Sequence, residues 1–259
     1  MRLARFYSMR SVVVVLAIAQ LLSSGLQAQG KGVRLEYGSK VGDTSVYHLT
    51  MDGNTTVFVG DRTQKTQIRT EMYLTQKVEA FKEGVIDLMT KIDSGSINVN
   101  NQTSVLPNVG QTVKTSLKKN GEIVNSSGFG PNINLNQMQL VFPDQALEVG
   151  SSWKSTMEPS PAVPVTLEVE YKVLGFEKIR DFECIKLASS VRSGPKSTIE
   201  GLQLKVQADG NIYYAHKEGK MVKNDVKSTM EMILKRVIDN QPQSIITRMG
   251  MDMQMELQY

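Results

Sequence analysis

Apolar and polar residues alternate over several long stretches of this chain. The alternation is clearest in residues 45–51, 70–81, 165–176 and 228–234, which are rich in β-branched and aromatic residues. Successive side chains of a β-strand point to opposite faces, so a period of two predicts strands with one buried and one wetted face. Helical periodicity is scarce. We therefore predict an all-β protein of antiparallel sheets, half-barrel or sandwich-like, with at most one short helix near residues 133–141.

Glycine-containing turns divide these strands into hairpins. An Asn-Gly dipeptide at 120–121 and an Asp-Gly dipeptide at 209–210 supply the positive φ angles that a two-residue hairpin loop needs. A third hairpin is expected around Gly84, which would take a left-handed conformation. The predicted opposing pairs are Leu117–Val124, Val206–Tyr213, Val78–Leu88 and Ala80–Ile86.

Several segments recur in the same order, which predicts an internal duplication. We expect a signal peptide over 1–28, a first β unit over 29–142 and a second over 143–259, folded as one domain or as two. The alternative is that unrelated antiparallel meanders resemble one another. The paired segments are 40–51 with 148–158 (offset 108), 76–81 with 171–176 (offset 95) and 119–124 with 208–213 (offset 89).

The first residues have the pattern of a secretory signal peptide. Three arginines precede an apolar run over residues 12–22, and small and polar residues follow up to Ala28. The run is short for a membrane span, so we expect no span after its removal, although an uncleaved anchor is the alternative. These features predict a periplasmic or secreted protein of the bacterial cell envelope.

Charge and cysteine content narrow the partners. The chain has 30 basic and 26 acidic residues, and three of the basic ones lie in residues 1–28, which leaves 27 − 26 = +1 for the remainder. A nearly neutral chain without a basic block gives no reason to expect a nucleic-acid partner. Cys184 is the only cysteine, so no intramolecular disulfide can form. Exported eukaryotic domains commonly contain disulfides, and a bacterial source fits better.

The C-terminal sequence MGMDMQMELQY carries the main candidate site. On a strand, Met249, Met251, Met253 and Met255 share one face with Leu257 and Tyr259. We interpret this stripe as a core face, with two alternatives: an apolar wall that contacts a ligand, since methionine suits adaptable binding surfaces, or a copper(I) site, since thioethers are soft ligands. Residues two apart on a strand are too widely spaced to share one ion unless their side chains converge.

Other candidate groups give little support for catalysis. Trp153 is expected to anchor the core, with ligand stacking as the alternative. His48 and His216 are too few for a zinc site without carboxylates from elsewhere, and Cys184 is predicted to be a buried, inert thiol. We recognise no nucleophile, nucleotide or paired-carboxylate motif. The expected protein is therefore not an enzyme and has no catalytic residue, metal or cofactor, unless its catalytic residues are distant in sequence.

Three further motifs support a resemblance. YGSKVGD (37–43), LEVGSSW (147–153) and ADGNIYYAHKEGK (208–220) resemble those of exported bacterial all-β proteins of unknown function. The antiparallel layout is also similar, at the level of fold, to the periplasmic half-barrels that carry lipoprotein acyl chains. The resemblance implies turn and strand motifs and no catalytic residues.

These observations predict an exported, non-catalytic binding or scaffold protein that cups an apolar ligand. Its expected partner is an apolar small molecule, a lipid or another envelope protein. The alternative function is a periplasmic copper(I)-binding protein that uses the C-terminal methionine stripe.

Overall fold

The computed structural model describes residues 32–127, 140–157, 159, 164–197, 199, 201–238 and 241–258. Residues from Val33 onward form one compact unit. The predicted signal peptide, Tyr259 and nearly all of the predicted helix at 133–141 lie outside the described residues. In the part of the chain that the structure describes, no helix is long and apolar enough to cross a membrane.

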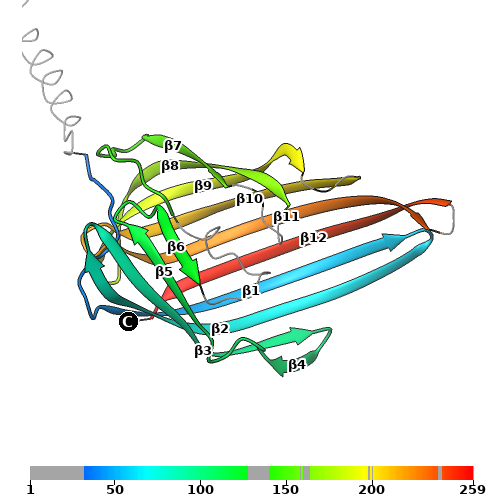
Figure 1. Ribbon diagram of the computed structural model, residues 1–259, viewed down its shortest axis with the longest axis horizontal. Coiled ribbons are helices and arrows are strands. Elements are labelled where there is room, and N and C mark those ends of the chain that lie inside the picture. Colours follow the sequence, from blue (N-terminus) through cyan, green and yellow to red (C-terminus); the bar gives the residue numbers. More distant parts are fainter. Residues whose placement is uncertain are drawn as a thin grey trace, which may run out of the picture. The chain divides into compact units, whose positions relative to one another are not determined.

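The unit is one open, antiparallel sheet of twelve strands, which confirms the predicted all-β class and selects the half-barrel over the sandwich (Figure 1). The order across the sheet is β6-β5-β3-β2-β1-β12-β11-β10-β9-β8-β7, and β4 pairs with β3 outside this path. The strands are β1 (Thr44–Val59), β2 (Arg62–Lys82), β3 (Val85–Val99), β4 (Gln102–Val105), β5 (Thr112–Lys118), β6 (Ile123–Ser127), β7 (Ser152–Met157), β8 (Val165–Ile179), β9 (Phe182–Ser197), β10 (Leu202–Ala215), β11 (Lys220–Ile238) and β12 (Gln241–Leu257).

The last strand lies in the middle of the sheet. β12 pairs with β11 on one side and with β1 on the other, in a register that runs from Tyr47–Leu257 to Val59–Ile245. The first and last strands of the chain therefore form the seam between β1–β6 and β7–β12. The four stretches of sequence alternation fall within β1, β2, β8 and β11, as predicted, and each observed strand is longer than its alternating stretch.

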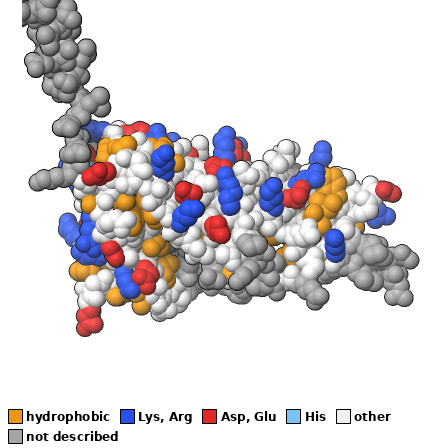
Figure 2. Space-filling model, turned by 90° about the horizontal axis from the view of Figure 1, so that it is seen from above, with side chains coloured by type: hydrophobic (Ala, Val, Ile, Leu, Met, Phe, Trp, Pro, Cys, Tyr) orange, Lys and Arg blue, Asp and Glu red, His pale blue; other side chains and the backbone are white. Residues whose placement is uncertain are grey.

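The two faces of the sheet differ in polarity because the alternation stays in register across strands. Tyr47, Leu49 and Met51 on β1 lie opposite Leu257, Met255 and Met253 on β12. The same face continues on β2 and on β8–β11, so one apolar surface crosses the sheet. Charged residues occupy the other face. On the side of the molecule seen in Figure 2, basic and acidic side chains are interspersed.

A segment before β1 closes one end of the half-barrel. The backbone N–H of Tyr37 donates to Lys119 O (2.7 Å) in the β5–β6 turn, and that of Gly38 donates to Gly219 O (2.8 Å) in the β10–β11 turn. Val33 and Leu147 form an isolated antiparallel β-bridge, in which the backbone N–H of each donates to the carbonyl oxygen of the other. These bonds join hairpins from the two halves of the sheet, so we call residues 33–38 the bridging segment.

The main core lies beneath the bridging segment on the apolar face. Phe142 and Tyr214 are fully buried there, with ring centroids 4.8 Å apart, and the ring of Tyr37 contacts both. The Tyr37 hydroxyl donates to Leu140 O (3.0 Å), and the Tyr214 hydroxyl donates to Glu36 O (2.8 Å). Both the half-buried Tyr37 and the fully buried Tyr214 thus have a hydrogen-bond partner, as burial of a polar group requires.

One turn occurs twice at the offsets found in the sequence. The N–H of Gly42 donates to Val78 O, and the N–H of Val78 donates to Asp43 O, both at 2.9 Å. Gly150 and Ser151 form the same two bonds with Val173, at 2.9 and 2.8 Å, and Gly42 and Gly150 both have φ +91°. The two glycines are 108 residues apart and the two valines are 95 apart, as in the sequence repeats. A β-bulge follows each valine. This recurrence supports the duplication, which stays a prediction.

The proposed match between residues 119–124 and 208–213 is wrong, because Asp209-Gly210 does not form a turn as Asn120-Gly121 does. Both residues lie within β10, between β9 and β11, and Gly210 pairs with Val226 and Ser189. A Cβ at Gly210 would lie 2.5 Å from Asp225 O, so glycine here permits a close approach of strands. The hairpin instead turns at residues 216–219, where Gly219 has φ +68°. The predicted pair Val206–Tyr213 is wrong, and Val206 pairs with Met230.

The other two hairpins are present, with shifts caused by bulges. The Asn-Gly turn joins β5 to β6, and Gly121 has φ +91°, but Leu117 pairs with Ile123 instead of Val124. At the turn around Gly84 (φ +81°), Val78 pairs with Leu88 as predicted. A bulge then moves Ala80 opposite Asp87 and not Ile86. A bulge inserts one residue into one strand and so shifts the pairing by one position. The residues of the turn alone do not predict where such a bulge lies.

Candidate binding cavity

A cavity of about 290 Å³ lies on the apolar face, next to the closed end. Its lining includes Leu88 of β3 and Thr115 of β5 on one side, and Val169 and Tyr171 of β8 on the other. Seven strands separate β5 from β8 in the sheet order. In a flat sheet these two strands would lie about 38 Å apart, at about 4.8 Å per step. The sheet must therefore curl, with its apolar face inside, around this cavity.

The cavity wall is mainly apolar, with a few polar side chains. Tyr47, Leu74 and Ile212 are among the apolar residues, and Met221 contributes from the start of β11. Gln76 and Thr90 also line the cavity, and Gln76 Nε2 donates to Thr90 Oγ1 at 3.5 Å. A concave, mostly apolar site with a small number of polar groups is typical of small-molecule binding sites.

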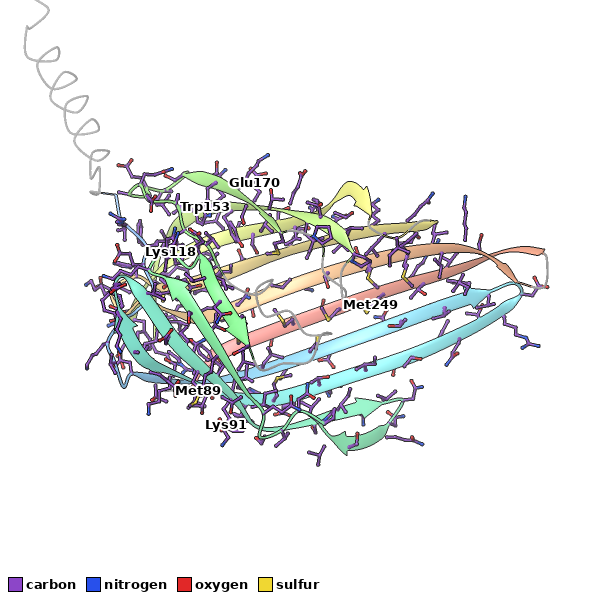
Figure 3. The ribbon with its side chains drawn as sticks, viewed as in Figure 1. Met89, Lys91, Lys118, Trp153, Glu170 and Met249 are labelled. Carbon is purple, nitrogen blue, oxygen red and sulfur yellow. The ribbon has the colours of Figure 1, made fainter. Side chains whose placement is uncertain are left out.

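The C-terminal methionine stripe is divided between different surroundings. β12 is a strand, and its methionines lie half-buried on the apolar face, while Leu257 is fully buried. Met253 and Met255 line the cavity. Met249 pairs with Met230 farther along the sheet, and Figure 3 shows it midway along the long strands. Met251 is not part of the cavity lining and instead contributes to the edge of a second, larger hollow. The ligand-binding role of Met249, Met251, Met253 and Met255 stays a prediction.

Methionines from other strands extend the stripe sideways. Met51 lies directly opposite Met253, and Met230 directly opposite Met249. The sequence of β12 alone did not predict these methionine pairs, because the register between neighbouring strands is set by turns and bulges elsewhere in the chain. The apolar face carries Met51, Met72, Met157, Met221, Met230, Met232, Met249, Met251, Met253 and Met255. Unbranched thioether chains give this surface an adaptable shape.

Trp153 does not line the cavity. Its indole N–H donates to Val141 O at 2.9 Å, and its ring stacks on Tyr171 with centroids 5.0 Å apart. Figure 3 shows it near the β7 edge of the sheet. The expected core anchor is confirmed, since Trp153 packs against the main core, and a ligand-binding role for Trp153 stays a prediction. Tyr171, against which it packs, does line the cavity.

The remaining candidates lie apart from the cavity. Cys184 is buried, as predicted, and its burial raises the pKa of the thiol to about 11. His48 stacks on Tyr73 and contacts Glu71 Oε1 at 2.9 Å on the wetted face. Within the described ranges, no three His, Cys, Asp or Glu side chains form a metal-binding group.

A larger hollow, of about 1520 Å³, lies on the opposite face of the sheet. Charged side chains line it, and many of them pair with one another: Arg69 lies 2.9 Å from Asp52, and Lys227 lies 3.8 Å from Asp252. Exposed pairs of this kind are solvated and contribute little to stability. The smaller apolar cavity is therefore the stronger candidate site, although its volume is lower.

Two cavity tyrosines predict a loss of stability at alkaline pH. Burial raises the pKa of Tyr47 and that of Tyr171 to about 12, from 10.0. The folded state thus holds these protons more tightly than the unfolded chain. Their contribution is present below about pH 10 and is lost as the pH rises toward about 12. Urea midpoints measured across this range should fall, and a Tyr47→Phe/Tyr171→Phe variant should show a shallower fall. Equal slopes in parent and variant would contradict this assignment.

Comparisons with known proteins give no family. No protein-family model matches this chain, and no curated protein matches it in sequence. A solved structure described as lipid–protein interactions in lipovitellin is 9% identical, with a TM-score of 0.49, and covers 85% of this chain. The chain spans only 25% of that lipovitellin chain.

Two other solved structures are more distant. The translocator domain of the autotransporter NalP from Neisseria meningitidis is 10% identical, has a TM-score of 0.22 and covers 95% of both chains. A DUF1329 family protein from Desulfovibrio piger is 9% identical, has a TM-score of 0.15, and the match covers 82% of this chain and 85% of that one. None of the three likenesses is close enough to carry an inference about function.

Proposed function

We propose that this protein is an exported, non-catalytic binding protein of the bacterial cell envelope that holds an apolar molecule in the cavity beneath its bridging segment. The cavity on the apolar face carries the proposal. Its walls come from strands of both halves of the sheet, and Met253 and Met255 belong to them. Export is supported by the signal-peptide pattern of residues 1–28.

Methionines at and beyond the cavity support a ligand of variable shape. Met255 lies in the lining, and the half-buried stripe continues from it through Met251 to Met249 along β12. A surface of this kind can repack around an alkyl chain at little cost, because methionine has three rotatable side-chain bonds. The ligand class that fits is therefore an acyl chain or another elongated apolar molecule.

Native mass spectrometry of the protein purified from a bacterial envelope tests this proposal. We expect a retained mass in the lipid range that organic extraction removes and that a fatty acid or alcohol restores. A protein that carries no such mass, and that takes up neither probe after extraction, would contradict the proposal. A retained copper mass would favour the alternative function.

A carboxylate introduced at Met253 should damage both stability and binding. Met253→Asp places a charge on the apolar face, where no basic residue lies directly opposite it. We expect a loss of about 1–3 kcal/mol in the free energy of unfolding, because Met253 is half-buried, and a loss of ligand retention.

Ser244→Asp is the matched control for this variant. It adds a carboxylate to the same strand on the wetted face, opposite Lys235, and should change stability by less than about 0.5 kcal/mol. Equilibrium urea unfolding measures both variants. Equal stabilities would show that the stripe does not face a dry surface.

The copper(I) alternative is supported by the cross-strand methionine pairs. Met51 opposite Met253, and Met230 opposite Met249, bring thioethers closer than any two along one strand. Side chains directly opposite each other have Cβ atoms about 5 Å apart, against about 7 Å for residues two apart on one strand. Tight copper(I) uptake by the parent that is lost in a Met51→Leu/Met253→Leu variant of unchanged stability would favour this alternative.

A further inference from the structure

The cavity wall has a polar side and an apolar side. Three neutral polar residues lie on neighbouring strands of the first half of the sheet: Gln76 on β2, Thr90 on β3 and Thr115 on β5. On β8, in the second half of the sheet, the wall consists of Val169 and Tyr171. A cavity with this division of polarity complements a molecule that joins a polar group to an apolar chain.

The strand register places these three polar side chains on the cavity face. Gln76 lies directly opposite Thr90, and Thr115 lies directly opposite Leu88, which is buried in the core on that face. Thr90 and Thr115 are therefore diagonal neighbours on one face, with Cβ atoms roughly 7 Å apart. A ligand head of a few atoms can contact more than one of the three side chains.

These polar groups have unused hydrogen-bonding capacity. Gln76 Nε2 donates to Thr90 Oγ1 at 3.5 Å, which is long for an N–H···O bond. A glutamine amide can donate two hydrogen bonds and accept two. The Thr115 hydroxyl has no hydrogen-bond partner among the described residues, although Thr115 is only 9% exposed. Polar groups at this depth are ordinarily bonded to protein, water or ligand.

No charged group of the described lining faces the cavity. Lys220 is the one charged residue in that lining, and the register places its side chain on the face opposite Tyr214 and Met221. Its Nζ lies 5.7 Å from the centroid of the Phe182 ring, and Phe182 is outside the lining. Every other polar side chain of the lining is neutral. A charged ligand head would therefore be buried without a counter-ion, which is strongly unfavourable.

We propose that the ligand is an uncharged single-chain amphiphile, whose hydroxyl, ester or amide group binds at Gln76, Thr90 and Thr115 and whose alkyl chain lies against Val169 and Tyr171. The inference rests on the proposed function and deepens it by naming the class of head group. Threonine hydroxyls and a glutamine amide both donate and accept hydrogen bonds. They match a head that presents a hydroxyl beside a carbonyl, as a monoacylglycerol does.

Binding of matched probes to the delipidated protein tests this inference. Decanol and monodecanoylglycerol are neutral, whereas decyl sulfate and decyltrimethylammonium carry permanent charges of opposite sign on a chain of the same length. Isothermal titration calorimetry measures each affinity at probe concentrations below micelle formation. We expect both neutral probes to bind at least about tenfold more tightly than either charged probe, because the cavity offers no counter-ion. A preference for monodecanoylglycerol over decanol would identify an ester-containing head within the proposed class.

A Thr90→Val/Thr115→Val variant should weaken binding of the neutral probes, because valine has nearly the shape of threonine without its hydroxyl. The affinity for monodecanoylglycerol is expected to fall about tenfold, which corresponds to the loss of one or two hydrogen bonds. Thr90→Ser/Thr115→Ser keeps both hydroxyls and should keep the affinity. Thr156→Val is the control, since Thr156 is exposed on the wetted face of β7. Urea unfolding of each variant checks that it is folded.

The possible outcomes separate the inference from the proposed function. If a charged probe binds as tightly as the neutral probes, or if the valine variant binds them as the parent does, the uncharged head at these threonines is overturned and an apolar binding protein remains. An equal loss in the serine variant would assign the effect to packing and overturn the role of the hydroxyls. If no probe binds the folded, delipidated parent, both proposals fail.

Discussion

Replacing Phe142 with Ala is expected to lower the free energy of unfolding by about 3–5 kcal/mol, the range for deletion of a buried aromatic ring. Phe142 is 2% exposed and contacts the rings of Tyr37 and Tyr214 beneath the bridging segment. Its loss would leave a cavity that the surrounding rings cannot fill. Equilibrium urea unfolding, followed by Trp153 fluorescence, measures the effect.

Phe176→Ala is the control for this experiment. Phe176 is 49% exposed, and the same truncation there should cost less than about 1 kcal/mol. If both variants were equally stable, the closed end would not be the main core of the protein.

Gly219→Ala is expected to cost about 2–4 kcal/mol, because it combines a backbone penalty with a clash. Gly219 has φ +68°, which costs an alanine about 1 kcal/mol. A Cβ at this position would also lie within 2.2 Å of Gly38 N and 2.7 Å of the Tyr37 carbonyl carbon. Both atoms belong to backbone, so the bridging segment would have to move, and overpacking adds about 1–3 kcal/mol.

Gly60→Ala isolates the backbone penalty from the clash. Gly60 also has a positive φ, +55°, but a Cβ there would meet no atom within 4 Å. We expect only about 1 kcal/mol for this variant. Hydrogen exchange of the Gly38 amide provides a second measurement, since faster exchange in Gly219→Ala alone would show that the bridging segment has detached. Equal losses in the two variants would refute the close contact.

Strand positions could be predicted from the sequence because the alternation depends on burial of one face. The stretch at 165–176 reads correctly as strand for this reason, and so does the methionine stripe. The turn at Gly84 was also predictable, since a left-handed residue is required there. In each case a local physical requirement decides the structure.

Pairing between distant strands was less predictable. Asp209-Gly210 has the sequence of a tight turn and lies within β10, because Gly210 lets the β11 backbone approach. The turn at Gly219 had a signal in the sequence HKEGK, which matches KKNGE at the β5–β6 turn with an offset of 98. The binding cavity could not be predicted, because Leu88 and Tyr171 meet only after the sheet curls.

The pairing of β1 with β12 has a consequence for the order of folding. Tyr47 and Leu257 are neighbours in the sheet, although more than two hundred positions separate them along the chain. Contacts of such high sequence separation form slowly, because loop closure must precede them. A ribosome must release every residue from β1 through β12 before this sheet can be completed. A native state that forms this late would leave the chain unfolded until β12 has been synthesised, which is compatible with the export proposed above.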